Sequence, residues 1–383
     1  MDFGWSDEEL RCRDAAFEFA KRELGDDIVD RDRSSRFSRE LWRRAARFGI
    51  QSLLLPPEYS GRKDQRDILT AVLIMEGLGR GSPDTGLCFA LSAQVFTVAL
   101  PILRFGTEEQ RRRFLPGLAS GDLIGAHALS EPGAGSDAFA LETVARRVPG
   151  GYRLEGRKRF VTLGPVADLA LVFATVDPAR GKWGVTAFVV ERAKDHFRAG
   201  ENQEKMGLRT VPFGDLHFEG ALVPEENRLG PEGAGVSIST ESLEYERCAI
   251  LASQLGTMER QLERAIEHAR ARRQFGEPIG RFQSVANRIA DMRLRLETAR
   301  LLLYKVAWLK RQGRSAMLEA ALLKLHLSES FVESSLDAVR THGGVGYLSE
   351  EGIERDLRDA VGGLIYAGTS DMQRRTIARL LGL

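Results

Sequence analysis

The stretch Ser130-Glu-Pro-Gly-Ala-Gly-Ser-Asp137 stands where the pattern of the sequence changes from helical to strand-like. Its two glycines and its Ser-Asp pair have the composition of a turn whose backbone N–H groups can approach a ligand closely. Taken alone, the same residues fit a plain β-turn equally well. The segments on either side, and motifs elsewhere in the chain, are needed to decide between these interpretations.

On the N-terminal side, the sequence predicts helices separated by turns. Ser6 and Ser38 each precede a segment with helical apolar spacing, so both serines are expected to be N-caps. The segment 66–105 is more uniformly apolar, which predicts helices buried on several sides. We therefore expect an N-terminal helical domain over residues 1–120.

On the C-terminal side, residues 121–230 contain short apolar runs bounded by Gly, Pro and Asp, which is typical of an antiparallel sheet or small barrel. Helical spacing then returns. It predicts a long helix over 282–311 and another over about 315–340. The expected fold class is α+β, with an N-terminal helical domain, a middle antiparallel β domain over 121–230 and a C-terminal four-helix-bundle domain over 231–383.

Composition limits the possible functions. The 383 residues are 43% hydrophobic and 28% charged, and the net charge of +1 gives no overall bias toward nucleic acid or a membrane. The three cysteines are odd in number and far apart, and the histidines lack metal-ligand spacing, so neither a disulfide framework nor a metal is predicted. There is no signal-peptide pattern, and no apolar run is expected to reach the roughly 18 residues that span a bilayer, so a cytoplasmic location is expected.

Six motifs occur in the order and near the spacing of one family, over almost the whole chain. Any one could arise by chance, but together they resemble the acyl-CoA dehydrogenase family. The resemblance implies an FAD-dependent enzyme with the three domains described above. The motifs are Ser130-Glu-Pro-Gly-Ala-Gly-Ser-Asp137, Lys205-Met-Gly-Leu-Arg209, Val223-Pro-Glu-Glu-Asn227, Arg272-Arg-Gln-Phe-Gly276, Gly343-Gly-Val-Gly346 and Tyr366-Ala-Gly-Thr-Ser370.

The resemblance makes the first motif part of a flavin-binding loop. Phe160 and Thr162 match an aromatic residue that packs on the flavin and a hydroxyl near its N5 edge. His127 stands where relatives often carry an aromatic residue. The residues that match positions lining the isoalloxazine ring and the FAD phosphates are His127, Leu129, Ser130, Gly135 and Ser136.

Arg272 is the centre of a second predicted cofactor region. It ends a helix with basic residues, and such a turn is often merely solvated. A guanidinium is also a natural bidentate partner for a pyrophosphate. The resemblance favours the cofactor role, with Arg272 on the FAD pyrophosphate and with Phe275 and Gln283 beside the cofactor.

Two further stretches are implied in FAD binding by the resemblance. Arg340, Gly343 and Gly344 resemble the segment that reaches the FAD of a neighbouring subunit, although glycines there also suit a helix C-cap. Relatives usually carry Gln at the position of Arg340. Thr369 and Asp371 match residues near the adenosine diphosphate portion of FAD.

The catalytic base of such an enzyme is a carboxylate that removes an α-proton while a hydride leaves the β-carbon. Many family members carry it near the C-terminus, where this chain has Ala367. Isovaleryl- and long-chain-type members instead carry it on a helix, just before the Arg of a Glu-Arg pair, and Glu246-Arg247 matches that position. A helix turns about 100° per residue, so Glu244 points roughly 200° away from Glu246. A Glu beside Arg is commonly a solvated surface residue, but with alanine at the other position Glu246 is the predicted base.

The substrate pocket is expected to involve residues next to both possible base positions. Arg247 is expected to orient the helix that carries Glu246, and Tyr366 is expected to line the acyl pocket. The predicted substrate-binding residues are Arg247, Tyr366, Ala367 and Gly368.

Three runs narrow the resemblance to dehydrogenases that oxidise an amino-acyl group, typically prolyl, on a peptidyl carrier protein in pyrrole-forming pathways. They are 256–270, 295–304 and 368–373. The resemblance implies a phosphopantetheine thioester of an acyl or peptidyl carrier protein, or acyl-CoA, as the partner. It also implies a homo-oligomer, dimer or tetramer, with an electron-transfer flavoprotein or oxygen as the electron acceptor.

Three alternatives remain open from the sequence. The first is a dehydrogenase of short- or branched-chain acyl-CoA. The second is a flavin monooxygenase on the same fold, in which Ala367 would be expected and Glu246 would not matter. The third is a non-catalytic binding protein, which would take up no FAD.

Overall fold

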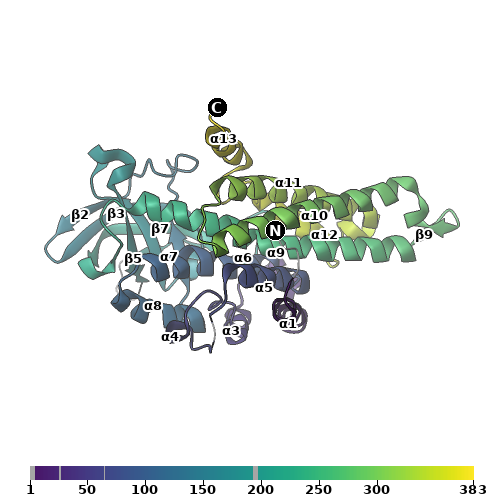
Figure 1. Cartoon of the computed structure of the whole chain (residues 1–383), viewed down its shortest axis with the longest axis horizontal. Helices are drawn as coiled ribbons and strands as arrows, with labels where there is room; N and C mark the ends of the chain where they lie inside the picture. The colour runs from purple at the N-terminus through teal and green to yellow at the C-terminus, as the bar shows by residue number, and fades with distance from the viewer. Residues whose placement is uncertain (1–4, 26, 64, 193–196) are drawn as a thin grey trace.

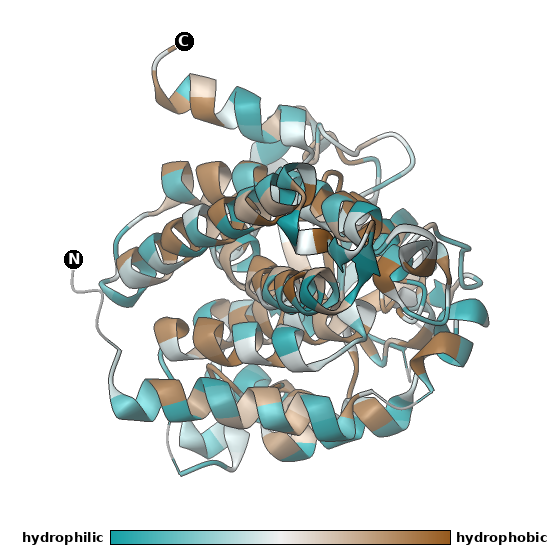
Figure 2. Cartoon of the chain, turned by 90° about the vertical axis from the view of Figure 1, so that its right-hand side faces the viewer, coloured by the Kyte–Doolittle hydropathy of each residue, from teal (hydrophilic) through white to brown (hydrophobic). Residues whose placement is uncertain are grey.

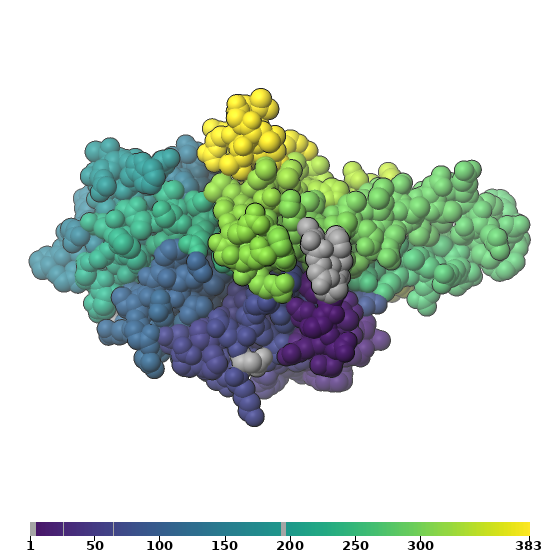
Figure 3. Space-filling model, viewed as in Figure 1, coloured from purple at the N-terminus to yellow at the C-terminus, as the bar shows by residue number. Residues whose placement is uncertain are grey.

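The structure, a computed structural model, describes residues 5–25, 27–63, 65–192 and 197–383. The molecule is elongated, with a sheet-containing end and a helical end (Figures 1 and 3). The tips of the longest helices form the helical end, and the last helix projects from one side of the molecule. This shape places different groups of the predicted site residues at opposite ends.

The N-terminal part of the chain is helical. Ser6 caps α1 (Asp7–Glu23) through a capping box, in which its hydroxyl accepts from the Glu9 N–H and the Glu9 carboxylate accepts from the Ser6 N–H. Ser38 accepts from the Leu41 N–H at the start of α3 (Arg39–Phe48), so both predicted N-caps are confirmed. The other helices before residue 85 are α2 (Ile28–Arg33), α4 (Pro57–Ser60) and α5 (Ile68–Gly81).

One continuous apolar helix runs through the middle of this part. It consists of α6 (Thr85–Gln94), the π-helical turn η1 (Val95–Ala99) and α7 (Leu100–Phe105). It has 21 residues, and an 18-residue window within it has a mean hydropathy of 1.9, which by length and composition is enough to cross a membrane, so the expectation that no apolar run reaches this length is wrong. Its apolar window is 89% buried inside the structure. A buried core helix of a folded domain meets the same criterion of length and hydropathy, so this helix is weak evidence for a membrane span.

After α8 (Glu108–Ser120) the chain forms a sheet in the order β6-β7-β3-β2-β4-β5-β8, with β1 beside β4. The pairs β1·β4 and β2·β4 are parallel, whereas the others are antiparallel. The sheet is therefore mixed: most of its strand pairs are antiparallel, as the sequence predicts, and the two pairs of β4 with β1 and β2 are parallel. Parallel neighbours are joined by long crossovers, which local alternation of residues does not reveal. The strands are β1 (Gly125–Ala128), β2 (Val144–Val148), β3 (Gly151–Thr162), β4 (Leu169–Thr175), β5 (Val185–Glu191), β6 (Arg198–Ala199), β7 (Phe213–Pro224) and β8 (Arg228–Leu229).

The C-terminal part consists of long helices. The predicted helix over 282–311 is confirmed as α10 (Gln283–Arg311), and the next as α11 (Met317–His342). Both pack on α9 (Gly235–Ala271), and α5 packs on α9 and α10. The hairpin β9 (Arg273–Gln274) and β10 (Glu277–Pro278) joins α9 to α10, and α12 (Ile353–Gly362) and α13 (Ser370–Leu380) follow α11. The short helices η2 (Gly164–Val166), η3 (Pro178–Gly184), η5 (Glu225–Asn227), η6 (Ile279–Arg281) and η7 (Gly343–Tyr347) lie in connections.

The N-terminal and C-terminal helices share one core. A single cluster of buried apolar residues includes Trp42 of α3, Met75 of α5, Leu255 of α9 and Phe331 of α11. Figure 2 shows the helices of this part carrying both apolar and polar residues around their axes, as helices with one buried face do. Helices from both halves of the chain therefore hold α9 in place.

Candidate active site

The helix α9 carries two carboxylates in different environments. Glu244 is buried and accepts from Lys310 Nζ at 2.9 Å and from the Ala316 N–H at 3.1 Å. Glu246 is partly buried and forms no hydrogen bond or ion pair with any residue that the structure describes. The two side chains face different surroundings, as their spacing on the helix predicts. Glu244 therefore holds helices together, whereas Glu246 is free to meet a ligand.

The surroundings of Glu246 suit a base. Burial raises the pKa of Glu246 to about 7, against the opposing positive charges of Arg247 and Lys324. A carboxylate with this pKa is ionised in a large fraction of molecules near neutral pH and binds a proton more strongly than an exposed glutamate does. The position that the sequence singles out is thus tuned for accepting a proton.

The segment that holds Ala367 lies beside this helix. Arg247 Nε donates to the Ala367 carbonyl oxygen at 3.3 Å. The Gln373 amide donates to the same oxygen at 3.1 Å and to the Gly368 oxygen at 3.0 Å. Ala367 has a φ of +53°, in the left-handed region that non-glycine residues rarely adopt. The structure thus brings the predicted substrate-binding residues 366–368 to the helix of Glu246.

Tyr366 forms an aromatic and polar wall in the same place. Its hydroxyl accepts from the side-chain amide of Gln254, and its ring centroid lies 4.7 Å from that of Phe89. Burial, together with the charges of Asp359 and Glu246, raises the pKa of the Tyr366 phenol, which stays neutral. Gln254 and Phe89 were not predicted, although Gln254 follows Glu246 by eight residues, a spacing close to two helical turns.

The predicted flavin loop is anchored by a buried ion pair that the sequence did not reveal. Lys158 Nζ lies 2.6 Å from the Glu131 carboxylate and 3.1 Å from the Leu129 carbonyl oxygen. The Glu131 carboxylate also accepts from the backbone N–H groups of Glu142 and Thr143, at 2.6 and 3.1 Å. These contacts fix the start of the loop from both sides.

The tip of the loop is open. Gly135 and Ser136 are exposed, and their backbone N–H groups donate to no described group. No atom lies within 4 Å of a Cβ built on Gly135. Backbone N–H groups that have no partner and open space beside them suit an anion such as a phosphate. This geometry fits the predicted binding of FAD phosphates.

Phe160 is the strained residue of this region. It has a φ of +60°, lies at an irregularity between β3 and β7, and leaves 52% of its surface exposed. The Phe213 ring stacks at 5.8 Å from it, and the Arg159 guanidinium lies 4.7 Å from its centroid. An exposed aromatic ring held in an unfavourable backbone conformation is typical of a binding surface. Thr162, two residues later on β3, is partly buried.

His127 lies on β1, and its ring is 5.2 Å from that of Phe173. Burial and the positive charge of Lys158 lower the pKa of His127 to about 4. The imidazole is therefore neutral and presents an aromatic surface. Leu129 and Ser130 follow it, and the Ser130 carbonyl accepts from the Arg159 N–H at 2.8 Å.

The second predicted cofactor region lies at the other end of the molecule. Arg272 is 26 residues after Glu246, about 39 Å along a helix. Arg272, Phe275 and Gln283 are exposed around the β9–β10 hairpin, and Phe275 is 94% exposed. One chain therefore does not bring this region to the flavin loop (Figure 1).

The Arg340 stretch belongs to this distal region. The rings of His342 on α11 and His268 on α9 are 4.5 Å apart, which places the end of α11 near Arg272. Arg340, Gly343 and Gly344 are exposed there. Thr369 lies elsewhere and caps α13 by accepting from the Met372 N–H, with Asp371 exposed in the first turn.

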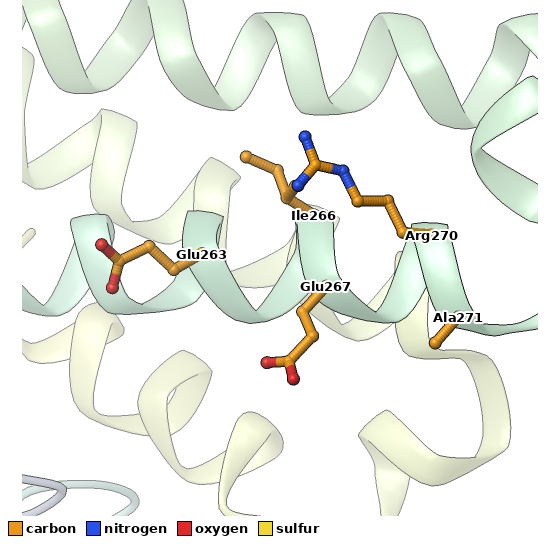
Figure 4. Close-up of a pocket in the computed structure, with 5 residues that line it drawn as sticks. All are labelled: Glu263, Ile266, Glu267, Arg270 and Ala271. Atoms are coloured by element: carbon orange, nitrogen blue, oxygen red, sulfur yellow. The ribbon is translucent and has the colours of Figure 1, made fainter.

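A shallow pocket of about 490 Å³ also lies on the distal part of α9. Its lining residues recur every three or four positions, so they form one face of the helix. Figure 4 shows Arg270 lying over Ile266. None of the predicted site residues lines it, and it begins about 26 Å along the helix from Glu246. Its lining residues are Glu263, Ile266, Glu267, Arg270 and Ala271.

Among the described residues, no group of three or more His, Cys, Asp and Glu is arranged to hold a metal ion.

Three family models match consecutive parts of the chain. They are the N-terminal domain of acyl-CoA dehydrogenase over residues 6–122, its middle domain over 126–221 and its C-terminal domain over 233–382. The chain belongs to the acyl-CoA dehydrogenase family. The predicted resemblance and the predicted fold class of this acyl-CoA dehydrogenase family member are thereby confirmed.

Individual relatives of this family member align over its full length. It is 43% identical over 384 residues to an L-prolyl-[peptidyl-carrier protein] dehydrogenase of Pseudomonas fluorescens, covering 100% of both chains. Among solved structures it is similar to the prolyl acyl carrier protein oxidase AnaB, with a TM-score of 0.97, 43% identity and coverage of 99% and 100%. It is also similar to PigA with FAD and proline, with a TM-score of 0.97, 38% identity and coverage of 100% of both chains.

Proposed function

We propose that this protein is an FAD-dependent dehydrogenase that oxidises the α,β carbons of a prolyl, or similar amino-acyl, group bound as a thioester to a peptidyl carrier protein. The observation that carries the proposal is the carboxylate of Glu246, which is partly buried, has no partner among the described residues and has a pKa of about 7. It lies on a chain that shares its family and its full length with prolyl-carrier-protein dehydrogenases.

Each residue of the site has a separate role in the proposed reaction. Glu246 takes the α-proton of the acyl group. The backbone N–H of Ala367 donates to no described group and is available to the thioester carbonyl, where negative charge develops. Arg247 holds Ala367 in place through its carbonyl oxygen. When bound, FAD supplies the acceptor for the hydride that leaves the β-carbon.

The wall opposite Glu246 favours a small acyl group. Tyr366 contacts both Gln254 and Phe89, so bulky side chains lie beside residues 366–368. The amide of Gln254 and the hydroxyl of Tyr366 add polarity that a saturated hydrocarbon chain does not need. A short ring that contains nitrogen is compatible with such a wall, whereas a long apolar chain is not.

The cofactor site points to a second copy of the chain. Arg272 lies about 39 Å along α9 from Glu246, so the distal region does not reach the candidate site of its own chain, although a guanidinium has the chemistry to bind a pyrophosphate. We therefore propose a homo-oligomer in which the distal region of one copy completes the FAD site of another. Leu294 and Leu301, seven residues apart on α10, are 62% and 50% exposed and offer apolar surface for that contact.

The function is tested with purified protein loaded with FAD. Prolyl-carrier thioester should bleach the flavin absorbance, and Glu246→Gln should slow this bleaching by at least about 10³-fold, because the variant has no base. Bleaching by acyl-CoA alone would show an acyl-CoA dehydrogenase instead. Unchanged bleaching in the variant would contradict the mechanism and favour a monooxygenase. Reoxidation by an electron-transfer flavoprotein or by oxygen, compared in the same assay, identifies the acceptor.

A further inference from the structure

One side of α9 contacts the segment that carries Tyr366 at two points. Arg247 Nε donates to the Ala367 carbonyl oxygen at 3.3 Å, and the side-chain amide of Gln254 donates to the Tyr366 hydroxyl. Arg247 and Gln254 are seven residues apart, which is close to two helical turns, so their side chains leave the helix on the same side. The segment therefore lies along a stretch of α9 that starts next to Glu246.

The amide of Gln254 is bonded at one end and free at the other. The residue is only 2% exposed, so its side chain is shielded from water. Its Nε2 donates to Tyr366, whereas its Oε1 accepts from no group that the structure describes. A buried carbonyl oxygen without a donor costs free energy, and a bound ligand with an N–H group removes that cost. The free oxygen of Gln254 is thus suited to a ligand that donates a hydrogen bond.

A free carbonyl oxygen is not by itself a binding site, as Gln261 on the same helix shows. Gln261 is also buried, donates to the Ser335 hydroxyl at 2.7 Å and likewise has no donor for its Oε1 among the described residues. It lies seven residues beyond Gln254, about 10 Å farther along the helix, and its partner is on α11. Gln254 differs because it is bonded to Tyr366, the neighbour of Ala367, whose N–H is available to the thioester carbonyl.

We propose that Gln254 determines the specificity for an amino-acyl group: its Oε1 accepts a hydrogen bond from the amine nitrogen of the thioester-bound substrate. The inference rests on the proposed function and deepens it. In a prolyl thioester the nitrogen is bonded to the α-carbon, directly beside the carbonyl group that the Ala367 N–H is available to bind. An acyl group held there extends along the same side of α9, and its N–H group meets Gln254. A saturated hydrocarbon group has no such donor and leaves the buried oxygen unpaired.

Tyr366 and Phe89 fix the direction of this carbonyl group. The Phe89 ring centroid is 4.7 Å from that of Tyr366, and the phenol binds the amide nitrogen of Gln254, so the oxygen at the opposite end of the amide has a set orientation. A preorganised acceptor discriminates between substrates because the wrong substrate leaves it unsatisfied. We expect the amine to be favoured by about 10- to 100-fold through this contact.

The test uses protein loaded with FAD and two thioesters of the same carrier, prolyl and cyclopentanecarbonyl, which differ only in that a CH2 group replaces the ring nitrogen. Flavin reduction gives kcat/KM for each, and the ratio of the two values measures selection for the amine. Gln254→Leu removes the acceptor and should lower this ratio by about 10- to 100-fold. Gln254→Glu keeps an acceptor oxygen and should retain the wild-type ratio. Gln261→Leu is the matched control and should also retain it.

Two further measurements separate a direct contact from a structural role. Tyr366→Phe removes the same hydrogen bond but keeps the Gln254 carbonyl group, so it should lower the ratio less than Gln254→Leu does. Dissociation constants of both thioesters, measured without turnover in the Glu246→Gln background, should show the same change in ratio on Gln254→Leu. If Gln254→Leu does not fold, Gln254→Met provides a side chain of similar length without an acceptor.

An unchanged ratio in folded Gln254→Leu would overturn the inference. An equal fall in Tyr366→Phe or in Gln261→Leu would do the same, as would a fall in Gln254→Glu, because that variant still offers an acceptor. If wild-type protein reduces no flavin with the prolyl thioester, the proposed function fails. If wild-type protein oxidises the prolyl thioester and Gln254→Leu leaves the ratio unchanged, only the role of Gln254 is refuted.

Discussion

At the scale of single residues, Glu244 and Glu246 lie two positions apart on α9 and have different roles. Glu244 stabilises the packing of helices, whereas Glu246 is the candidate catalytic base. The sequence was sufficient to predict that these carboxylates face different ways, because helix geometry fixes their angle. It was not sufficient to predict the raised pKa of Glu246. The segments that bury Glu246, and Lys324, whose charge opposes the shift, are distant from it in the sequence. The Glu131–Lys158 pair was missed for the same reason: its members are 27 residues apart, and their partnership depends on how β3 folds.

Glu246 should make the protein less stable as its carboxylate ionises. Its folded-state pKa of about 7 is above the ordinary value of 4.5, so the native state is favoured below pH 4.5 and loses that advantage as the pH rises through 7. Glu246→Gln removes this cost. We expect the variant to gain up to about 3 kcal/mol over wild type at pH 8.5 and almost nothing at pH 4.5. Thermal melts of both proteins at the two pH values measure the difference. An equal gain at both values would contradict this account.

Glu244 should behave in the opposite way. It is buried and paired with Lys310 and with the Ala316 N–H, so Glu244→Ala leaves a buried ammonium and an N–H without partners. We expect a loss of about 3 kcal/mol in unfolding free energy, measured by urea denaturation. The acid limb of flavin reduction should keep its position, because Glu244 faces away from the site. A shifted limb would mean that the two carboxylates are coupled.

At the scale of secondary-structure elements, the sequence predicted the helices and helix ends that are determined by residues close to one another in the chain. The N-caps at Ser6 and Ser38, the bounds of α10 and the end of α9 all depend on residues within a turn of the feature. The parallel pairing of β4 and the packing of α5 on α9 depend on contacts between distant segments. Periodicity carries no information about such contacts, so they appeared only in the structure.

The flavin loop should depend on the strand β3 behind it. Lys158→Met leaves the Glu131 carboxylate buried without its cation, and the loop that offers the Gly135 and Ser136 N–H groups should loosen. We expect FAD to dissociate at least about tenfold more readily, measured by flavin fluorescence. Arg157→Gln is the matched control. Arg157 lies on β3, as Lys158 does, and forms a partly exposed ion pair with Asp215 of β7, so its loss should leave the cofactor bound. Equal losses in both variants would mean that the whole strand, rather than the loop anchor, was damaged.

At the scale of the whole molecule, the division of the predicted cofactor residues is the main consequence of the fold. Because α9 is a straight path between Glu246 and Arg272, no rearrangement of side chains brings the two ends of one copy together. The resemblance to the family implies both groups in FAD binding, but it does not show this separation. Because the length of α9 separates the two groups of predicted FAD residues, we expect that they meet only when two copies of the chain assemble.

Disruption of that assembly should release the cofactor without unfolding the chain. In the double variant Leu294→Glu, Leu301→Glu, the added charges oppose burial of the α10 face against a second copy. We expect a monomer on analytical ultracentrifugation, an unchanged helical circular dichroism spectrum and loss of most bound FAD. Leu222→Glu is the matched control, since Leu222 is 52% exposed but lies on β7 at the opposite end. A monomer that kept its FAD would refute the composite site, whereas an unchanged oligomer would move the contact away from α10. At a fixed concentration of free FAD, recovery of FAD binding at higher protein concentration would show that the loss comes from subunit dissociation, because occupancy of a site within one chain would not change.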